Sequence, residues 1–373
     1  MISCFGSSIG NNELEAVGRV FEAQWIGQGR EVEKFERMIA AKAAAPDFAF
    51  LNNGSNALQM AIHLCNLPKR TEVILPSFTW WACANAILLN DLIPVLADVS
   101  YDTGNITEEA IERQINPKTS AILVVHYAGK PANMDEIKSF RLPVIEDAAH
   151  AIDSSYKGKH CGMLGEVGIF SFDAVKNLTT GEGGGVVSND LEMIHRAKKL
   201  RYAGISKSGF ENSQNRSHWW QYEINESYPK MTNTDIAAAI GLQQLEKLPD
   251  LQRRRKEIWE IYMKVLSEDW ACSWITCPSS PEKHERHSYF TYCVKISNGK
   301  RDELANFLFQ NEVYTVLSYH PLHLYDYLKT DYRLVNCERL AESALNLPIH
   351  PRLSNNDLDK IISLLKEFAL QRG

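Results

Sequence analysis

Short apolar runs alternate with longer amphipathic segments through the first half of the chain. The runs are rich in branched and aromatic side chains and have the length of strands. The predicted strands cover residues 48–52, 72–75, 94–98, 121–126, 144–147, 169–173 and 185–188, and the predicted helices cover 55–65, 81–89 and a segment near Asp135. This alternation predicts the α/β class, with a mostly parallel sheet between two layers of helices.

The pattern changes after residue 189. A helix is predicted over 191–202, and a long connection over 203–233 suggests a functional or assembly role. Two further helices follow, DIAAAIGLQQLEKL and RRRKEIWEIYMKVL. Strands at 289–296 and 314–318 with helices at 301–310 and 356–370 predict a small α+β unit. We therefore expect a large domain over residues 1–250 and a small domain over 251–373.

Composition narrows the class of protein. The 373 residues are 45% hydrophobic and 23% charged, which is typical of a globular protein. The net charge of −6 argues against non-specific nucleic-acid binding, which needs a basic face. No apolar run approaches the ~20 residues of a membrane span, and the first residues lack the pattern of a signal peptide. We expect neither nucleic acid nor membrane as a partner.

The eight cysteines are scattered and form no C-x-x-C pair. In a chain of this length, that distribution favours reduced thiols over a disulfide framework or a zinc site. We therefore expect a cytoplasmic protein without a metal.

Candidate chemistry follows two of the predicted strands. Asp147 ends the strand of IEDAAH, where it is either a helix N-cap or a buried carboxylate that needs a cationic partner. Lys176 follows the strand of GIFSFDAVKNLTTGEGGG. Glycines after it allow a close backbone approach, and hydroxyls at Ser171 and at Thr179 or Thr180 are candidate phosphate donors. A desolvated lysine amine is a nucleophile toward a carbonyl.

Two further features follow the first two strands. Asn53-Gly54-Ser55-Asn56 lies between a strand and a helix, where free amides form an anion site. Trp80 lies where it could stack on a flat cofactor, whereas we expect Trp81 to be a core residue. A lysine, a carboxylate, a phosphate turn and an aromatic ring together form the set that a pyridoxal-phosphate site requires.

The ordered motifs resemble the DegT/DnrJ/EryC1/StrS family of pyridoxal-phosphate-dependent sugar aminotransferases over nearly the whole chain. The matching segments are QWIGQGREVEKFE, NNGSNAL, LPSFTWWACANAI, VHYAGKPANMDEI, IEDAAHAIDSSYKGKHCG, SFDAVKNLTTGEGGGVVSND, IAAAIGLQQLEKL, SYHPLH and LNLPIHP. The resemblance implies a fold type I enzyme with a large domain built on a seven-stranded sheet and a smaller C-terminal domain.

The resemblance also assigns roles. Lys176 matches the lysine that forms the Schiff base, and Asp147 matches the partner of the pyridine nitrogen. Trp80 matches the stacking aromatic, and His150 matches a position beside the cofactor, near its phenolic oxygen. The phosphate-binding positions correspond to Gly54, Ser55, Asn56 and Ser171.

Two positions depart from the family pattern. Asp173 stands where S-F-H is common before the lysine segment. The loop that reaches the neighbouring subunit's phosphate usually reads like G-Y-N-Y-R-M-S-D, whereas this chain has SYPKMTNTD. Either Lys230 or Asn233 is then the candidate for that contact.

The resemblance implies a reaction in two halves. L-glutamate gives its amino group to the cofactor, and a keto group of a nucleotide-linked deoxysugar receives it, for surface-polysaccharide (O-antigen) or glycoside biosynthesis. Segments HYAG, EDAAHA and TTGEGG favour carbon 4 over carbon 3. The resemblance also implies a homodimer with shared active sites. Tyr319, His320 and His323 of SYHPLH are candidate substrate residues, with packing as the alternative for this segment.

Three other functions remain open from sequence. The first is an aminotransferase for a cyclitol or a free keto sugar. The second, a sugar 3-dehydratase, is disfavoured because such relatives replace the lysine with histidine. The third, a non-catalytic regulator, is disfavoured because Lys176, Asp147 and the phosphate turn are all present.

Overall fold

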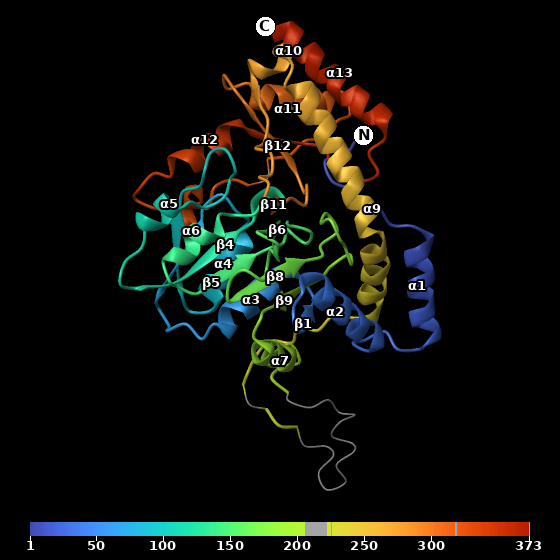
Figure 1. Cartoon of the computed structure of the whole chain (residues 1–373), viewed down its shortest axis with the longest axis vertical. Coiled ribbons are helices and arrows are strands. Elements are labelled where there is room, and N and C mark those ends of the chain that lie inside the picture. The colour runs from blue at the N-terminus through green and yellow to red at the C-terminus, as the bar shows by residue number, and fades with distance from the viewer. Residues whose placement is uncertain (206–221, 225, 318, 373) are drawn as a thin grey trace.

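The computed structural model describes residues 1–205, 222–224, 226–317 and 319–372. Most of the long connection predicted over 203–233 therefore lies outside the described residues, as does Ser318. Figure 1 shows a central sheet with helices around it and the C-terminal elements gathered at one end.

The central sheet has seven strands in the order β1-β9-β8-β5-β4-β2-β3. Only β9 runs antiparallel to its neighbours. The mostly parallel α/β sheet is therefore confirmed. The strands are β1 (Phe48–Leu51), β2 (Glu72–Pro76), β3 (Ile93–Ala97), β4 (Thr119–Val125), β5 (Val144–Asp147), β8 (Val167–Ser171) and β9 (Gly184–Val187).

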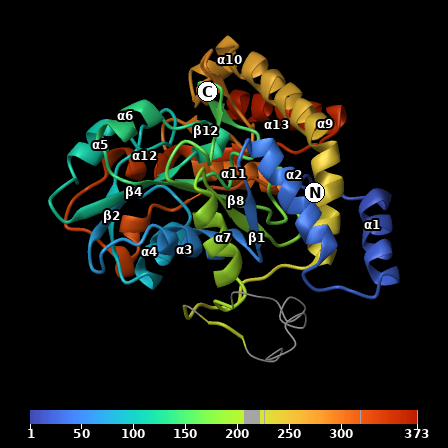
Figure 2. The ribbon, with the colours of Figure 1, turned by 60° about the horizontal axis from the view of Figure 1, so that its bottom comes forward.

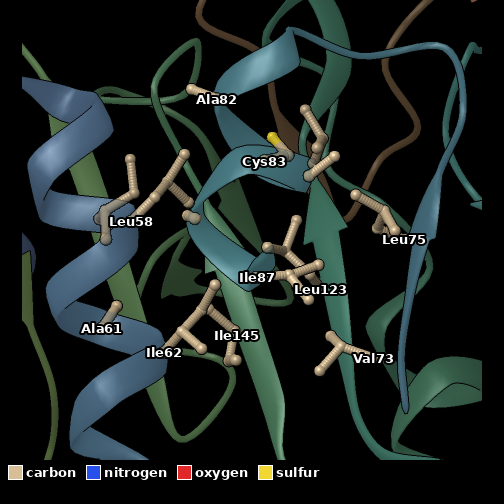
Figure 3. Packing of buried hydrophobic residues seen from close by; sticks show 14 of the residues in the cluster. Leu58, Ala61, Ile62, Val73, Leu75, Ala82, Cys83, Ile87, Leu123 and Ile145 are labelled. Atoms are coloured by element: carbon tan, nitrogen blue, oxygen red, sulfur yellow. The ribbon is translucent and has the colours of Figure 1, made fainter. Parts of the chain in front are cut away.

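Alternating side chains of each strand enter two separate cores. In β1, Ala49 and Leu51 join one hydrophobic cluster, and Phe48 and Phe50 join the other. The first cluster lies under α3 (Gly54–Leu64), α4 (Trp81–Leu89) and α7 (Leu191–Leu200). Figure 3 shows α3 and α4 packing over β2, β4 and β5 in this cluster.

The second cluster covers the opposite face of the sheet. It includes side chains from α2 (Arg30–Ala43), α5 (Glu108–Glu112), α6 (Met134–Ser139) and the first part of α9 (Asp235–Leu266). The helix α1 (Asn11–Glu22) packs outside this layer, against α9. Both faces of the sheet are thus buried, as parallel sheets require.

The helix α9 corrects one prediction. It continues for 32 residues through Pro249, where we expected two helices. Proline removes one backbone hydrogen bond, but burial on both sides of it holds the helix together. Leu242 and Leu248 pack in the second cluster, and Ile258 and Tyr262 pack in a third. Figure 2 shows this helix linking the sheet layers to the C-terminal elements.

Most of the C-terminal elements surround the third cluster, whose buried members lie between Ile258 and Phe368. This separate core supports the proposed division into 1–250 and 251–373, although α9 crosses residue 250 without a break. The elements are α10 (Asp269–Cys272), β10 (Ile275–Thr276), β12 (Tyr292–Ile296), α11 (Arg301–Gln310), α12 (Val335–Ser343), β13 (Ala344–Leu347) and α13 (Asn355–Arg372). The helix α12 instead packs its buried Cys337 and Leu340 in the first cluster.

The strand predicted over 314–318 is wrong. Its described residues make only an isolated bridge, Val316 with Asn346, beside the bridge of Val313 with Ile2. The remaining short elements are η1 (Tyr127–Gly129), β6 (Ser155–Tyr156), β7 (Lys159–His160), β11 (Glu285–Arg286), η2 (Leu322–Leu324) and η3 (Asp326–Leu328). Within the described part of the chain, no helix is long and apolar enough to cross a membrane.

Candidate active site

A cavity of about 440 Å³ lies at the carboxyl ends of the central strands. Ligands of parallel α/β sheets bind at this edge. Its walls include residues from the N-terminal segment and from the C-terminal elements as well as from the sheet. The predicted site residues that line it are Gly54, Ser55, Trp80, Asp147, His150, Ser171, Lys176 and Tyr319.

The start of α3 opens on this cavity. The side chain of Asn53 caps the helix by accepting a hydrogen bond from the Asn56 amide at 2.7 Å. The first intrahelical bond runs from Ala57 to Asn53, so the amides of Gly54 and Ser55 precede it. A Cβ added at Gly54 would lie 2.8 Å from Ser171 Cβ and 2.9 Å from its hydroxyl. Gly54 and Ser171 thus form a close-fitting, polar cradle suited to an anion.

Two adjacent carboxylates at the end of β5 point to opposite faces of the sheet. Asp147 borders the cavity, and its Oδ1 accepts a hydrogen bond from the Ala149 amide at 2.9 Å. Its Oδ2 accepts from the Cys83 thiol at 3.2 Å. Glu146 instead turns into a buried network on the other side of the strand. Only Asp147 therefore presents a carboxylate to the cavity from this strand.

The Lys176 side chain enters the cavity from the loop after β8. Its backbone amide donates to the Asp173 carbonyl at 3.0 Å, and its ammonium lies 4.8 Å from the centre of the Phe290 ring. Burial lowers the pKa of Lys176, while the charges of Asp147 and Asp173 act in the opposite direction. An amine with a lowered pKa is a better nucleophile near neutral pH.

The hydroxyls of Thr179 and Thr180 hold this loop together and do not line the cavity. Thr179 donates to the Phe172 carbonyl at 3.2 Å and accepts from the Gly181 amide at 2.9 Å. Thr180 donates to the Glu182 carbonyl at 2.7 Å. Ser171 and these two threonines were the candidate phosphate donors. Of the three hydroxyl residues, Ser171 lines the cavity.

Three aromatic side chains form a connected wall. The His150 ring stacks on Phe290 with 4.2 Å between ring centres, and its Nε2 lies 2.9 Å from the Tyr319 hydroxyl. Its Nδ1 is buried without a partner among the described residues. Burial, together with the nearby Lys176 charge, lowers the pKa of His150 well below its ordinary value. A neutral imidazole therefore faces the cavity at neutral pH.

The two tryptophans of the β2–α4 turn have different environments. Trp80 borders the cavity with 61% of its surface exposed, and its ring centre is 6.3 Å from that of Tyr319. Trp81 is partly buried against the first hydrophobic cluster and contacts the ring of Tyr327. An exposed ring at a cavity wall can stack on a planar ligand.

Several predicted site residues do not reach the cavity of their own chain. The Asn56 side chain donates to Asn52, and the Asn233 side chain donates to the carbonyls of Leu51 and Glu182. Lys230 is exposed over the Tyr202 ring. His320 is also exposed, and its ring contacts Tyr325. His323 is buried, where its Nδ1 lies 2.7 Å from the Ser77 hydroxyl, an arrangement that serves packing.

The sequence predictions missed three residues of this site. Phe290 and Phe5 line the cavity and stack on each other with 5.7 Å between ring centres. Cys83 contacts Asp147 from α4. Phe290 lies on a predicted strand and Cys83 lies on a predicted helix, so their local patterns indicated only core positions. Their tertiary partners, which are distant in sequence, give them a place in the site.

Solved structures with the same fold define the class of protein. The aminotransferase TlmJ from Streptoalloteichus hindustanus is 33% identical and superposes with a TM-score of 0.92, covering 100% of this chain and 99% of that chain. An assigned sugar aminotransferase of Streptococcus pneumoniae, solved in a PMP-form, is 25% identical with a TM-score of 0.92 and covers 100% of both chains. The fold and the comparisons define a pyridoxal-phosphate-dependent aminotransferase of fold type I.

The chain belongs to the DegT/DnrJ/EryC1/StrS aminotransferase family, which it matches over residues 7–366. A relative from Saccharopolyspora spinosa, a dTDP-4-dehydro-2,3,6-trideoxy-D-glucose 4-aminotransferase, is 34% identical over 365 residues. That match covers 96% of this chain and 94% of the relative. The predicted family, enzyme class and cofactor are thus confirmed.

We predict that Gly54→Ala weakens binding of pyridoxal phosphate, because the new methyl group would displace Ser171. Overpacking of about 1–3 kcal/mol corresponds to a rise in Kd of about 5- to 150-fold. Titration of the apoenzyme with the cofactor, followed by absorbance, measures this Kd. Gly18→Ala is the matched control, since a Cβ at Gly18 in α1 meets nothing within 4 Å. An unchanged Kd in Gly54→Ala would rule out the cradle as the phosphate site.

Proposed function

We propose that this protein transfers the amino group of L-glutamate to the C4 keto group of a nucleotide-linked deoxysugar. The observation that carries the chemical part of this proposal is the convergence of three groups on one cavity: Lys176, Asp147 and the start of α3. These groups reach the cavity from three different strand ends, and each offers what a different part of pyridoxal phosphate needs.

The residues present fit the cofactor. Gly54, Ser55 and Ser171 would hold the phosphate, because the amides at the start of α3 face the Ser171 hydroxyl across a gap too small for a side chain at residue 54. Trp80 would stack on the ring, and Asp147 would meet the ring nitrogen. The unpartnered Nδ1 of His150 is a buried polar atom that a ligand in this cavity could satisfy.

Bound pyridoxal phosphate supplies an electron sink for the bonds at the α-carbon of the amino donor. The chain itself moves and holds the protons. Lys176 Nζ, with its pKa lowered by burial, takes the proton from the donor α-carbon and returns it one position away as general base and acid. The Asp147 carboxylate holds the proton of the ring nitrogen. His150 and Tyr319, joined at 2.9 Å, form part of the wall of the cavity.

For Lys176→Ala we predict loss of amino transfer with the cofactor still bound, because the phosphate cradle and Asp147 remain. Turnover should fall by about 10³-fold or more, the upper part of the range for a general acid–base group. Formation of 2-oxoglutarate from L-glutamate measures the first half of the reaction. Lys157→Ala, at an exposed lysine paired with Asp135, is the control and should retain turnover. Retained turnover in Lys176→Ala would remove the proposed role.

Two observations support a nucleotide-linked 4-keto sugar as the amino acceptor. The relative that is 34% identical is named a 4-aminotransferase of a dTDP-linked deoxysugar. The segments HYAG, EDAAHA and TTGEGG of this chain also resemble those of relatives that act at carbon 4. A product of this kind serves polysaccharide or glycoside biosynthesis. We place the reaction in the cytoplasm, where the eight free thiols stay reduced.

We predict that the glutamate-loaded enzyme aminates dTDP- or UDP-linked 4-keto-6-deoxy sugars faster than the 3-keto isomers. Mass spectrometry of the products, with nuclear magnetic resonance to locate the new amine, makes the comparison. Free inosose derivatives test the cyclitol alternative in the same assay. Faster turnover of the 3-keto sugars or of inososes would replace the proposed acceptor while leaving the chemistry of Lys176 intact.

An exposed apolar surface supports a homodimer. Large apolar side chains are exposed just before, on and just after α1, where a monomer would leave them in water: Ile9, Leu14, Phe21, Trp25 and Ile26. Exposed apolar groups of this size favour a protein interface. Asn233 is bonded within its own chain, so the exposed ammonium of Lys230 is the better candidate for the phosphate of the partner.

We predict that the protein sediments as a dimer and that Leu14→Glu, which places a charge on this surface, weakens the dimer. Sedimentation equilibrium measures both masses. Glu22→Lys near the end of α1 changes a charge at an exposed polar position and serves as the control. A monomer mass for the unmodified protein at micromolar concentration would exclude the shared site.

A further inference from the structure

Cys83 lies in the first turn of α4, and its side chain is fully buried. Figure 3 shows Cys83 at the start of α4, in the same apolar cluster as Ile87 and Leu123. Its Sγ is 3.2 Å from Asp147 Oδ2 on one side and 3.3 Å from the Thr79 hydroxyl on the other. The three side chains form a short hydrogen-bonded row, in which Asp147 and Thr79 border the cavity and Cys83 lies between them.

The direction of these bonds follows from the number of protons. A thiol has one hydrogen, and an ionised carboxylate only accepts. Cys83 therefore donates to Asp147, and the Thr79 hydroxyl donates to the sulfur. Burial, with the nearby Asp147 charge, raises the pKa of the Cys83 thiol well above its ordinary value. The thiol thus remains a donor across the working pH range.

A sulfur atom at residue 83, in place of an oxygen atom, changes the strength of the hydrogen bond to the Asp147 carboxylate. A thiol is a weak donor, whereas a hydroxyl on a carboxylate makes a short, charge-assisted bond. The apolar surroundings strengthen the effect of either bond on the charge it meets. The other oxygen of Asp147 is bonded to the Ala149 amide and does not depend on residue 83. Among the described side chains, Cys83 is the one that donates a hydrogen bond to this carboxylate.

We propose that Cys83 is a positioning residue that sets the proton affinity of Asp147 and, through it, how firmly the cofactor ring nitrogen is protonated. The inference rests on the proposed role of Asp147. With serine at residue 83, a stronger bond lowers the proton affinity of Asp147. With alanine, the loss of a donor raises it. The unmodified enzyme lies between these two states.

The pH midpoint of the visible absorption band of the bound cofactor measures this effect. A more basic Asp147 draws the ring proton toward itself, which reduces the positive charge of the ring and raises the pKa of the attached Lys176 nitrogen. We expect the midpoint to move up in Cys83→Ala and down in Cys83→Ser, each by about half a pH unit, the size that follows from one hydrogen bond. The Kd of the cofactor should change by less than about threefold, or ~0.7 kcal/mol.

Cys161→Ala is the matched control, because Cys161 is an equally buried thiol in the second hydrophobic cluster. It removes the same volume and should leave the midpoint unchanged. Shifts in the same direction for Cys83→Ala and Cys83→Ser would indicate a packing defect, and unchanged midpoints would show no coupling. Either result would overturn the inference.

Asp147→Asn separates this inference from the proposed function. If the midpoint shifts in Asp147→Asn but not in the two Cys83 variants, Asp147 is the ring partner and only the role of Cys83 fails. If Asp147→Asn leaves the midpoint unchanged, Asp147 is not the ring partner and the proposed assignment fails with it. Thermal unfolding of each apoenzyme checks that the variants fold.

Discussion

The site depends on how two neighbouring carboxylates are buried at the end of β5. The His126 Nδ1 accepts from the Ala132 amide at 3.1 Å, so its proton is on Nε2, which donates to Glu146 at 2.8 Å. The Glu146 carboxylate also accepts three backbone amides at 2.6–2.7 Å, from Gly162, Leu164 and Gly165. A buried charge is tolerated only with such partners. Since successive side chains of a strand alternate, the fixed position of Glu146 directs Asp147 to the cavity.

Close approach of neighbouring backbone segments helps to place Lys176 at the cavity. The antiparallel strand β9 returns beside β1 and β8, where a Cβ on Gly184 would lie 2.5 Å from the backbone of Asn53 and Gly54. The loop between β8 and β9 is closed by the hydroxyls of Thr179 and Thr180. Its lysine and the start of α3 border the same cavity. Rigid elements and local hydrogen bonds thus preorganise the site.

Many periodic parts of the fold could be predicted from sequence, although the amphipathic helices α1 and α2 were missed. Other exceptions have physical causes. The helices Trp81–Leu89 and Arg301–Gln310 and the strand Val144–Asp147 have the predicted bounds, because their patterns agree with their burial. The break expected at Pro249 is absent, because packing on two cores outweighs the local cost. Helix α12 and strand β13 were missed, since their short patterns acquire meaning only through packing against β12.

The residues of the site also divide into those that the sequence could predict and those that it could not. Each predicted residue that lines the cavity lies at a strand end or shortly after one, except Tyr319, whose motif came from resemblance rather than from periodicity. Thr179 and Thr180 carry hydroxyls of the kind that bind phosphate, but these hydroxyls donate to backbone carbonyls instead. Cys83 has the sequence pattern of any core cysteine, and its contact with Asp147 crosses 64 positions of the chain. Sequence patterns identify residue types, whereas the direction of each polar atom depends on tertiary packing.

The C-terminal part of the chain supplies side chains that form part of the cavity wall. Phe290 and Tyr319 supply two sides of the wall around His150. His323 binds the segment that contains Tyr319 to Ser77, which follows β2. The continuous helix α9 carries this part, because its second half packs in the third cluster while its first half packs on the sheet. Phe290 contacts the Lys176 ammonium and Tyr319 contacts His150, so both contacts depend on how the C-terminal part of the chain packs on the sheet layers. The environment that lowers the pKa of Lys176 is thus a property of the assembled chain.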